Sequence, residues 1–375
     1  MTQGCKQCYS FYKNTTSYVV CSAQYILCGF PQKGRKTMKK RLLAILLVLL
    51  MLSSLSASAF AAKNDTVELL IGGVTSMNAK DAVTKFIELV GEYSGGTITC
   101  VDFPDNQLGN DEQRWEMTQT GECDISIGST SSVASSYNDF YIFDTPYLFL
   151  SRDEAFDVGF ASEAGQAIIG GVEELGLKGL ALWENGFRNV TTNNKEVNSL
   201  ADLKGLKLRT MDNAIHLAAW KAMGANPTPM AFSEVFTALQ QGTVDGQENP
   251  YGIIVGNKFE EVEKFAVETR HSFTPYYVVM NLDRWNDLTP EQQEAVTKAM
   301  AEATQFEKEQ SAKYEQEDVG TIEAAGCKVI KLSDDALAEF KAAADSADCA
   351  SMAMEKMEHP ELGQGLLDAL AAARG

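Results

Sequence analysis

The sequence predicts an α/β protein whose two similar lobes close on a cleft like a hinged clamshell. Three observations support this fold class. Short apolar stretches with strand character alternate with stretches whose apolar residues recur at helical spacing. The alternation occurs twice, over about residues 67–127 and again from about residue 187. No low-complexity linker separates the halves, so the chain is expected to cross between two closely joined lobes.

The first half is predicted to contain three strands with a helix between each pair. The strands lie at residues 67–71, 97–101 and 123–127. The first helix has apolar residues at helical spacing and ends at Gly95-Gly96, and the second covers about residues 110–120. This βαβαβ order predicts a parallel sheet with right-handed crossovers, and ligands of such sheets bind beyond the carboxyl ends of the strands.

The second half repeats the pattern. A strand at residues 206–209 precedes a helix that reaches Met223 and stops at Gly224. Ser233 is predicted to be the N-cap of a helix over residues 234–241. The strands that follow are predicted at residues 243–246, 265–269 and 276–281.

A long helix is predicted after these strands. Thr289, Pro290 and Gln292 have the pattern of a capping box with proline at the first helical position. The helix is expected to run to about Val319, and its many charged residues suit a solvated helix that crosses between the lobes. A late strand at residues 326–332 and further helices complete the chain.

The N-terminal region predicts export. Basic residues 39–41 precede an apolar run at 42–52 and small residues at 57–61, the order of a cleaved secretory signal. The run is shorter than the ~20 residues of a membrane span, although an uncleaved anchor is the alternative. The signal is therefore placed at residues 38–61, starting at Met38. Residues 1–37, with four cysteines and no acidic residue, are interpreted as lying outside the natural protein.

Composition excludes several classes of function. Residues 1–61 hold eight of the 32 basic and none of the 51 acidic side chains, so residues 62–375 carry a formal charge of −27. Such a surface repels nucleic acid and anionic lipid. Four cysteines are too few for a disulfide scaffold, although one bridge of unknown pairing is possible: Cys100, Cys123, Cys327 and Cys349. Three scattered histidines predict no metal site, and we expect no cofactor.

Two arginines are candidate anchors for an anionic ligand. Arg209 closes a predicted strand, where a side chain that faces the cleft belongs, and Arg188 lies at the passage between the halves. A guanidinium meets a carboxylate with two parallel hydrogen bonds. A structural salt bridge with one of the many acids is the alternative for each.

Further candidates lie near these arginines. The amide of Asn249 is a possible ligand donor or a turn residue before Pro250. Phe232 is either a cleft wall or a hydrophobic staple. Tyr276 and Tyr277 alternate on a strand, so one is expected to face the core and the other the cleft. Five aromatic residues are expected to pack the crossover: Phe140, Tyr141, Phe143, Tyr147 and Phe149.

Several motifs resemble one family. These are FPDNQLG at residues 103–109, GFRN at 186–189, DLKGLKLR at 202–209 and the run GANPTPMAFSEVFTALQQGTVDGQENP at 224–250. Together the chain resembles the solute-binding protein of a tripartite ATP-independent periplasmic (TRAP) transporter, of the dicarboxylate- and sialate-binding type. The resemblance covers essentially residues 64–345.

The resemblance implies a type II periplasmic-binding-protein-like clamshell in which each lobe is a mixed sheet flanked by helices. Lobe I would comprise residues 62–185 and about 275–312, and lobe II residues 186–274 and about 313–375. A monomer of this kind captures a small organic carboxylate outside the cytoplasm and delivers it to membrane permease subunits, driven by an ion gradient and without catalysis.

The resemblance also implies site residues. Arg209 matches the arginine that pairs with the ligand carboxylate, and Arg188 matches a second arginine beside it. Asn249 matches a cleft asparagine and Phe232 a cleft-wall phenylalanine. These residues define the carboxylate end of the site, to which we add Tyr276 as a cleft residue.

The far end of the site departs from the family pattern. Ser129 and Ser132 stand where sialate-binding members carry a glutamate and an arginine, which argues against sialate. The first loop, which holds Thr75, lacks a histidine that many sugar-acid members show. We expect Thr75 and Ser129 to contact the ligand. Dicarboxylates, sugar acids, 2-oxo acids and aromatic acids all remain open.

Two other functions are consistent with the sequence. The liganded lobes of an extracytoplasmic sensor would dock on a membrane receptor instead of a permease. An exported enzyme would need a nucleophile with a base, paired acids or a metal, and the three scattered histidines do not supply one. We therefore predict a binding protein and no enzyme.

Overall fold

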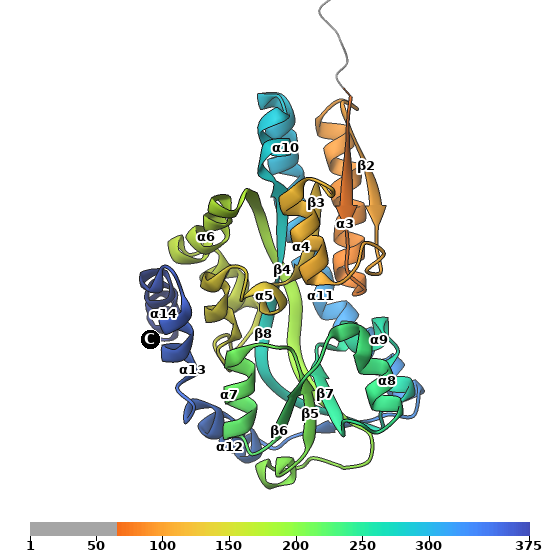
Figure 1. The fold of residues 1–375 in the computed structure, drawn as a ribbon, viewed down its shortest axis with the longest axis vertical. Helices are drawn as coiled ribbons and strands as arrows, with labels where there is room; N and C mark the ends of the chain where they lie inside the picture. Colours follow the sequence, from red (N-terminus) through yellow and green to blue (C-terminus); the bar gives the residue numbers. More distant parts are fainter. Residues whose placement is uncertain (1–65) are drawn as a thin grey trace, which may run out of the picture. The chain divides into compact units, whose positions relative to one another are not determined.

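Two long antiparallel strands organise the fold. The computed structural model describes residues 66–375, so the predicted signal peptide and residues 1–37 lie outside the described part. Strands β4 (Leu177–Thr192) and β8 (Phe265–Asn281) pair along almost their entire lengths at the centre of one sheet (Figure 1). The strand order is β2-β1-β3-β8-β4-β7-β5-β6, and β9 also pairs with β8.

The first lobe confirms the predicted βαβαβ unit. Strands β1 (Val67–Gly72), β2 (Ile98–Phe103) and β3 (Ile125–Ser129) are parallel, and β3 pairs antiparallel with β8. Helices α3 (Met77–Tyr93) and α4 (Asp111–Thr120) connect them. The third strand starts two residues later than predicted, so Ser129 is its last residue and lies at the carboxyl edge of the sheet.

The second lobe is built on β5 (Lys207–Thr210), which pairs in parallel with β6 (Asn226–Pro229) and β7 (Gly246–Asn249). Helix α7 (Ala214–Ala222) follows β5 and ends before Gly224, as predicted. The predicted strand at residues 243–246 was wrong. The backbone of 243–245 forms the turn after a helix, and pairing with β4 begins only at Gly246.

Two other sequence predictions for this half were wrong. Residues 265–269 and 276–281 belong to the single strand β8, because residues 272–275 between them also pair with β4. Ser233 is not an N-cap. It lies inside the 3₁₀ helix η5 (Phe232–Glu234), and its hydroxyl makes no cap hydrogen bond to α8 (Val235–Gln240).

The pairing of the two central strands shifts register at three places, after Gly179, Glu184 and Arg188 of β4. The second shift, between Glu184 and Gly186, lies next to the lobe boundary predicted after residue 185. Gly186 has a φ of 118° and its Cα hydrogen faces Pro250, whose Cβ would lie 3.2 Å from an added Cβ. A glycine is therefore required where the strand bends between the lobes.

The predicted long helix is present and its cap is confirmed. Helix α11 (Pro290–Ala324) begins after Thr289, which exchanges both capping-box hydrogen bonds with Gln292. It extends five residues past the predicted end at Val319. One part packs on α3 in the first lobe, and another on α9 (Tyr251–Gly256) and β9 (Lys328–Lys331) in the second.

Short helices fill the remaining connections. Between β3 and β4 they are α5 (Thr130–Val133), η1 (Asn138–Asp144), η2 (Glu154–Phe160), α6 (Glu163–Gly170) and η3 (Gly171–Leu175). Elsewhere they are η4 (Leu200–Leu203), η6 (Phe259–Glu261) and α10 (Leu282–Asp287). The C-terminal helices are α12 (Asp334–Asp345), α13 (Cys349–Lys356) and α14 (Pro360–Arg374), and α14 packs beside α6 (Figure 1).

The aromatic crossover is packing, as predicted. The rings of Phe140, Phe143 and Phe149 are buried in the largest apolar cluster. Cys100, Cys123, Cys327 and Cys349 are all unbridged. Among residues 66–375, no helix combines the length and the apolar character needed to span a bilayer.

Candidate ligand-binding site

A cavity of about 420 Å³ lies at the carboxyl edges of β3 and β5 and is lined from both lobes. Its volume is within the usual range for small-molecule sites. The structure brings all seven sequence-predicted site residues to this cavity: Thr75, Ser129, Arg188, Arg209, Phe232, Asn249 and Tyr276. The sheet places residues that lie far apart in the chain around one space.

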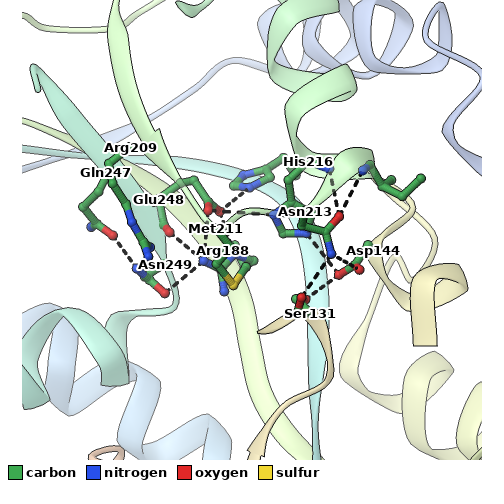
Figure 2. Close-up of polar contacts among 12 residues, drawn as sticks. Ser131, Asp144, Arg188, Arg209, Met211, Asn213, His216, Gln247, Glu248 and Asn249 are labelled. Carbon is green, nitrogen blue, oxygen red and sulfur yellow. Dashed lines mark hydrogen bonds and ion pairs between the residues drawn. The ribbon is translucent and has the colours of Figure 1, made fainter. Parts of the chain in front are cut away.

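Arg188 enters the cavity wall from β4 and is held by its neighbours in β7. Its Nε and Nη2 donate to the two carboxylate oxygens of Glu248 at 2.6 and 3.0 Å (Figure 2). Nη2 also donates to the backbone carbonyl of Glu248 at 2.7 Å and to Asn249 Oδ1 at 2.9 Å. Among the described residues, nothing accepts a hydrogen bond from Nη1 of Arg188.

Glu248 is the counter-ion of Arg188, and sequence reasoning missed it. Burial opposes ionisation of this fully buried carboxyl, but the charge of Arg188 and a hydrogen bond from His271 outweigh burial and hold its pKa far below the usual range. His271 Nε2 lies 3.0 Å from the Glu248 carboxylate. Because a carboxylate only accepts, Nε2 carries the proton, and Thr269 donates to Nδ1 at 2.9 Å.

Asn249 orients Arg188 from the other side. Its oxygen accepts from Arg188, and its nitrogen donates to Gln247 Oε1 at 2.5 Å (Figure 2). Gln247 in turn donates to Thr191 at 2.6 Å. The predicted role of Asn249 was a donor to the ligand. The structure shows the amide already joined to two protein groups, with its side chain still on the cavity wall.

Arg209 is surrounded very differently. It lies on β5 with 2% of its surface exposed, and its Nε and Nη2 donate to one backbone carbonyl, that of Met230, at 3.1 and 2.7 Å. The Phe232 ring centroid lies 5.7 Å from its Cζ. No carboxylate of residues 66–375 forms an ion pair with it. Burial, followed by the like charge of Arg188, lowers its pKa to about 10, although Glu248 and Glu112 oppose this shift.

Polar groups from the first lobe complete the lining. The hydroxyl of Ser129 and the side-chain oxygen of Asn185 are buried without a hydrogen-bond partner among the described residues. Thr75 accepts from Asn257 at 3.0 Å. Buried polar atoms are normally paired, so unpaired ones on a cavity wall are places for ligand groups.

The predicted alternation of the two tyrosines is confirmed. Tyr276 lines the cavity, and its hydroxyl lies 3.2 Å from Ser76 Oγ. Tyr277 points to the opposite face, where its ring packs edge-on against Trp115 at 4.9 Å. Its hydroxyl donates to the backbone carbonyl of Asp111 at 3.0 Å.

A second buried network beside the cavity was also missed. Asn213 caps α7 and donates to the Ser131 carbonyl at 3.1 Å and to Asp144 at 2.6 Å, so it ties the second lobe to the first (Figure 2). His216 Nε2 lies 3.1 Å from the same carboxylate. His216 and His271 are 55 positions apart in sequence, and no local motif signals that both approach Glu248.

The site has the chemistry of binding. Within residues 66–375 no cluster of three or more His, Cys, Asp or Glu side chains is arranged to hold a metal ion. What the cavity offers is guanidinium groups, unpaired hydrogen-bonding atoms and an aromatic wall. Two lobes joined by crossing strands, with such a cavity between them, define the class of clamshell solute-binding proteins.

Comparison with known proteins places the chain within that class. The model of the family "DctP: Bacterial extracellular solute-binding protein, family 7" matches residues 73–353. The chain belongs to this family, as the motifs at residues 103–109 and 186–250 predicted.

Relatives of this chain are described as binders of two kinds of acid. It is 34% identical to the 2,3-diketo-L-gulonate-binding periplasmic protein YiaO of Escherichia coli, over 78% of this chain and 88% of that protein. It is 35% identical to the C4-dicarboxylate-binding periplasmic protein DctP of Rhodobacter capsulatus, over 64% and 73%. The crystal structure of the sugar acid binding protein DctPAm from Advenella mimigardefordensis with galactonate superposes with a TM-score of 0.76, at 31% identity, over 82% and 98%.

Proposed function

We propose that this protein captures a small organic carboxylate in the cavity between its lobes and presents it to a TRAP permease for uptake. Arg209 is the anchor for the carboxylate, and Arg188 assists it. The protein acts outside the cytoplasm as a monomer, and it binds its ligand without transforming it. The relatives that bind carboxylates support the ligand class, and the family supports the extracytoplasmic location.

The observation that carries the proposal is the unpaired charge of Arg209. A buried guanidinium without a counter-ion is costly, and proteins keep such groups where a partner arrives. Its Nη1 makes no hydrogen bond to the described residues, and Nε and Nη2 meet only the Met230 carbonyl. A carboxylate in the cavity supplies the missing negative charge and accepts hydrogen bonds in the planar geometry that a guanidinium favours.

The surface charge sharpens the argument. With a formal charge of −27 over residues 62–375, the protein repels anions at long range. An acid therefore binds only where local cationic groups outweigh this long-range repulsion. Within the described cavity lining, these groups are the guanidiniums of Arg188 and Arg209. Arg209, which forms no ion pair with the described residues, explains why a carboxylate is favoured over a neutral solute.

Titration calorimetry of the purified protein against a library of organic acids tests this function. We expect at least one acid to bind with one-to-one stoichiometry and to raise the melting temperature, with a stabilisation that grows with the logarithm of the ligand excess. Arg209→Gln should lower the affinity for that acid by at least about 30-fold, because the ligand carboxylate is then buried without a cation.

The matched control is Arg374→Gln. Arg374 pairs with a carboxylate of the protein itself, that of Glu154 at 2.6 Å. It lies on the last helix and outside the cavity. This variant should retain wild-type affinity. A library in which no acid binds, or an Arg209→Gln protein that binds like the wild type, would overturn the proposal.

A further inference from the structure

We infer that the ligand is a polyhydroxylated monocarboxylate and that the cavity discriminates against the matching dicarboxylate. This inference rests on the proposed function, because it takes Arg209 as the anchor of one carboxylate. Its basis is the set of charges and unpaired acceptors on the cavity wall.

Within the described cavity lining, one guanidinium keeps an uncompensated charge for a ligand anion, whereas the other offers only a free nitrogen. Among residues 66–375, the basic residues that line the cavity are Arg188 and Arg209. Arg188 is already neutralised, since two of its nitrogens meet the carboxylate of Glu248 at 2.6 and 3.0 Å. Arg209 alone is unpaired. A first carboxylate therefore finds a counter-ion, and a second finds none.

The acidic lining adds to this asymmetry. Asp111, Glu112 and Asp212 also line the cavity. Asp111 is satisfied by Arg114 at 2.5 Å and by the Ser129 amide at 3.1 Å. Glu112 and Asp212 form no ion pair within the described residues. Glu112 lies on α4 and Asp212 directly follows β5. Burial, followed by the charges of Asp111 and Asp212, raises the pKa of Glu112.

A second ligand carboxylate would face these like charges, whereas a ligand hydroxyl would find acceptors. Carboxylates accept hydrogen bonds and never donate them when ionised. Asn185 Oδ1 and the Ser129 hydroxyl are buried on the wall without a partner among residues 66–375. Hydroxyl groups donate to all of these atoms. An acid with several hydroxyls and one carboxylate therefore matches the wall, and an apolar acid leaves its acceptors unpaired.

The size of the cavity agrees with an acid of more than a few atoms. At about 420 Å³, the cavity lies within the range of sites that hold small organic ligands. A four-carbon acid leaves part of that space to water, and a hexonate fills more of it. Hydroxylated acids of both lengths belong in the test, because the lobes adjust the space as they close.

The test uses matched ligands that differ in one feature. The C6 set comprises hexonates of several configurations, the corresponding hexarates with two carboxylates, the hexitols with none, and hexanoate without hydroxyls. The C4 set comprises erythronate and threonate, tartrate, erythritol and butyrate, and succinate and benzoate are added. Calorimetry at fixed ionic strength gives each dissociation constant. We expect the best hydroxylated monocarboxylate to bind at least about 30-fold tighter than its dicarboxylate and its polyol.

Charge-neutral variants then identify the residues that make the cavity prefer the monocarboxylate over the dicarboxylate. Glu112→Gln and Asp212→Asn should each narrow the gap between monocarboxylate and dicarboxylate several-fold by improving binding of the dicarboxylate. Glu116→Gln is the matched control, because Glu116 lies one turn further along α4, is exposed and does not line the cavity. It should leave the gap unchanged.

The outcomes separate the two proposals. Tighter binding of a hexarate, tartrate, succinate or benzoate than of every hydroxylated monocarboxylate would overturn this inference and leave the carboxylate-binding function standing. An unchanged gap in both Glu112→Gln and Asp212→Asn would overturn the assigned role of these acids. Failure of all acids to bind would overturn the proposed function, and this inference with it.

Discussion

Arg188 and Arg209 line the same cavity, yet the protein surrounds them differently. Behind Arg188, Glu248 and His271 form one chain of buried hydrogen bonds, and Asn249 and Gln247 form a second. Behind Arg209 there is one backbone carbonyl. The first arginine is fixed in place before any ligand arrives. The second is buried with its charge uncompensated.

This difference suggests that Arg188 mainly positions the ligand, whereas Arg209 supplies most of the electrostatic binding energy. A guanidinium that is already neutralised contributes little net charge to the cavity, but it presents one free nitrogen at a fixed place. An unpaired guanidinium keeps its full charge for the ligand, at the expense of the stability of the unliganded protein. We therefore expect substitutions at the two arginines to have opposite effects on the stability of the unliganded protein.

The largest effect is expected from Arg188→Met. This change leaves the Glu248 carboxylate buried beside two histidines, His271 at 3.0 Å and His216 at 4.0 Å, and without its arginine, so the free energy of unfolding should fall by about 3–5 kcal/mol. Urea unfolding at pH 7 measures the loss. Adding Glu248→Gln removes the stranded charge and should restore more than half of it. A loss below about 1 kcal/mol for the single variant would show that the ion pair is not structural.

Arg209→Met should act in the opposite direction. Methionine keeps an unbranched apolar side chain and removes the charge whose pKa burial lowers to about 10. The free energy of unfolding without ligand should rise by about 1–3 kcal/mol, even though two hydrogen bonds to Met230 are lost. The same urea experiment measures it. A clear decrease would mean that those hydrogen bonds outweigh the cost of the buried charge.

The sequence predicted the elements and the arginines well, because both depend on local patterns. Helical periodicity, the capping box at Thr289 and the position of Arg209 near the end of a strand are each readable within a few residues. Family motifs named Arg188, Phe232 and Asn249. The cavity confirms that these side chains converge, while their contacts with a ligand remain a prediction.

Local patterns of this kind could not predict which strands and side chains pair across long sequence distances. Strand β8 looked like two strands, because the polar residues 270–272 resemble a break. Only the pairing of residues 272–275 with β4 shows that the strand continues. The partner of Arg188 was missed for a related reason. Any of 51 acidic residues was available in sequence, and only the register of β4 against β7 places Glu248 beside Arg188. The same sheet places His271, on β8, beside Glu248.

A smaller effect concerns pH and the network behind Arg188. Glu263 accepts from Thr191 and, at 3.4 Å, from Gln247, which itself holds Asn249. Burial raises the pKa of Glu263 to about 8 against these hydrogen bonds, with a further contribution from the charge of Glu260. A raised pKa in the folded state gives stability that is complete below the unfolded value near 4.5. That stability falls as pH rises through 8.

Glu263→Gln tests that assignment. The glutamine oxygen can keep both contacts, and its nitrogen replaces Oε1, which has no partner among the described residues. Between pH 6 and pH 9 the wild type should lose about 1–2 kcal/mol more stability than this variant. Thermal unfolding across the range measures the difference. Parallel pH curves for the two proteins would show that Glu263 does not titrate there. Burial also raises the pKa of Glu307 and Asp318. These two residues change the stability of both proteins equally with pH, so their contribution cancels in the difference.

The smallest effect is expected where the chain behind Arg188 ends. Thr269→Val removes the hydroxyl that donates to His271 Nδ1 and leaves the fold otherwise filled, because valine has nearly the shape of threonine. One buried acceptor loses its partner, so the free energy of unfolding should fall by about 1 kcal/mol. Ligand affinity, measured by calorimetry, should change less than about 3-fold, because Glu248 still holds Arg188 with two nitrogens. A tenfold loss of affinity at unchanged stability would show instead that the His271 tautomer controls how Arg188 meets the ligand. No matching substitution exists behind Arg209, because its hydrogen-bond acceptor within the described part of the chain is the Met230 backbone carbonyl, which every side chain leaves in place.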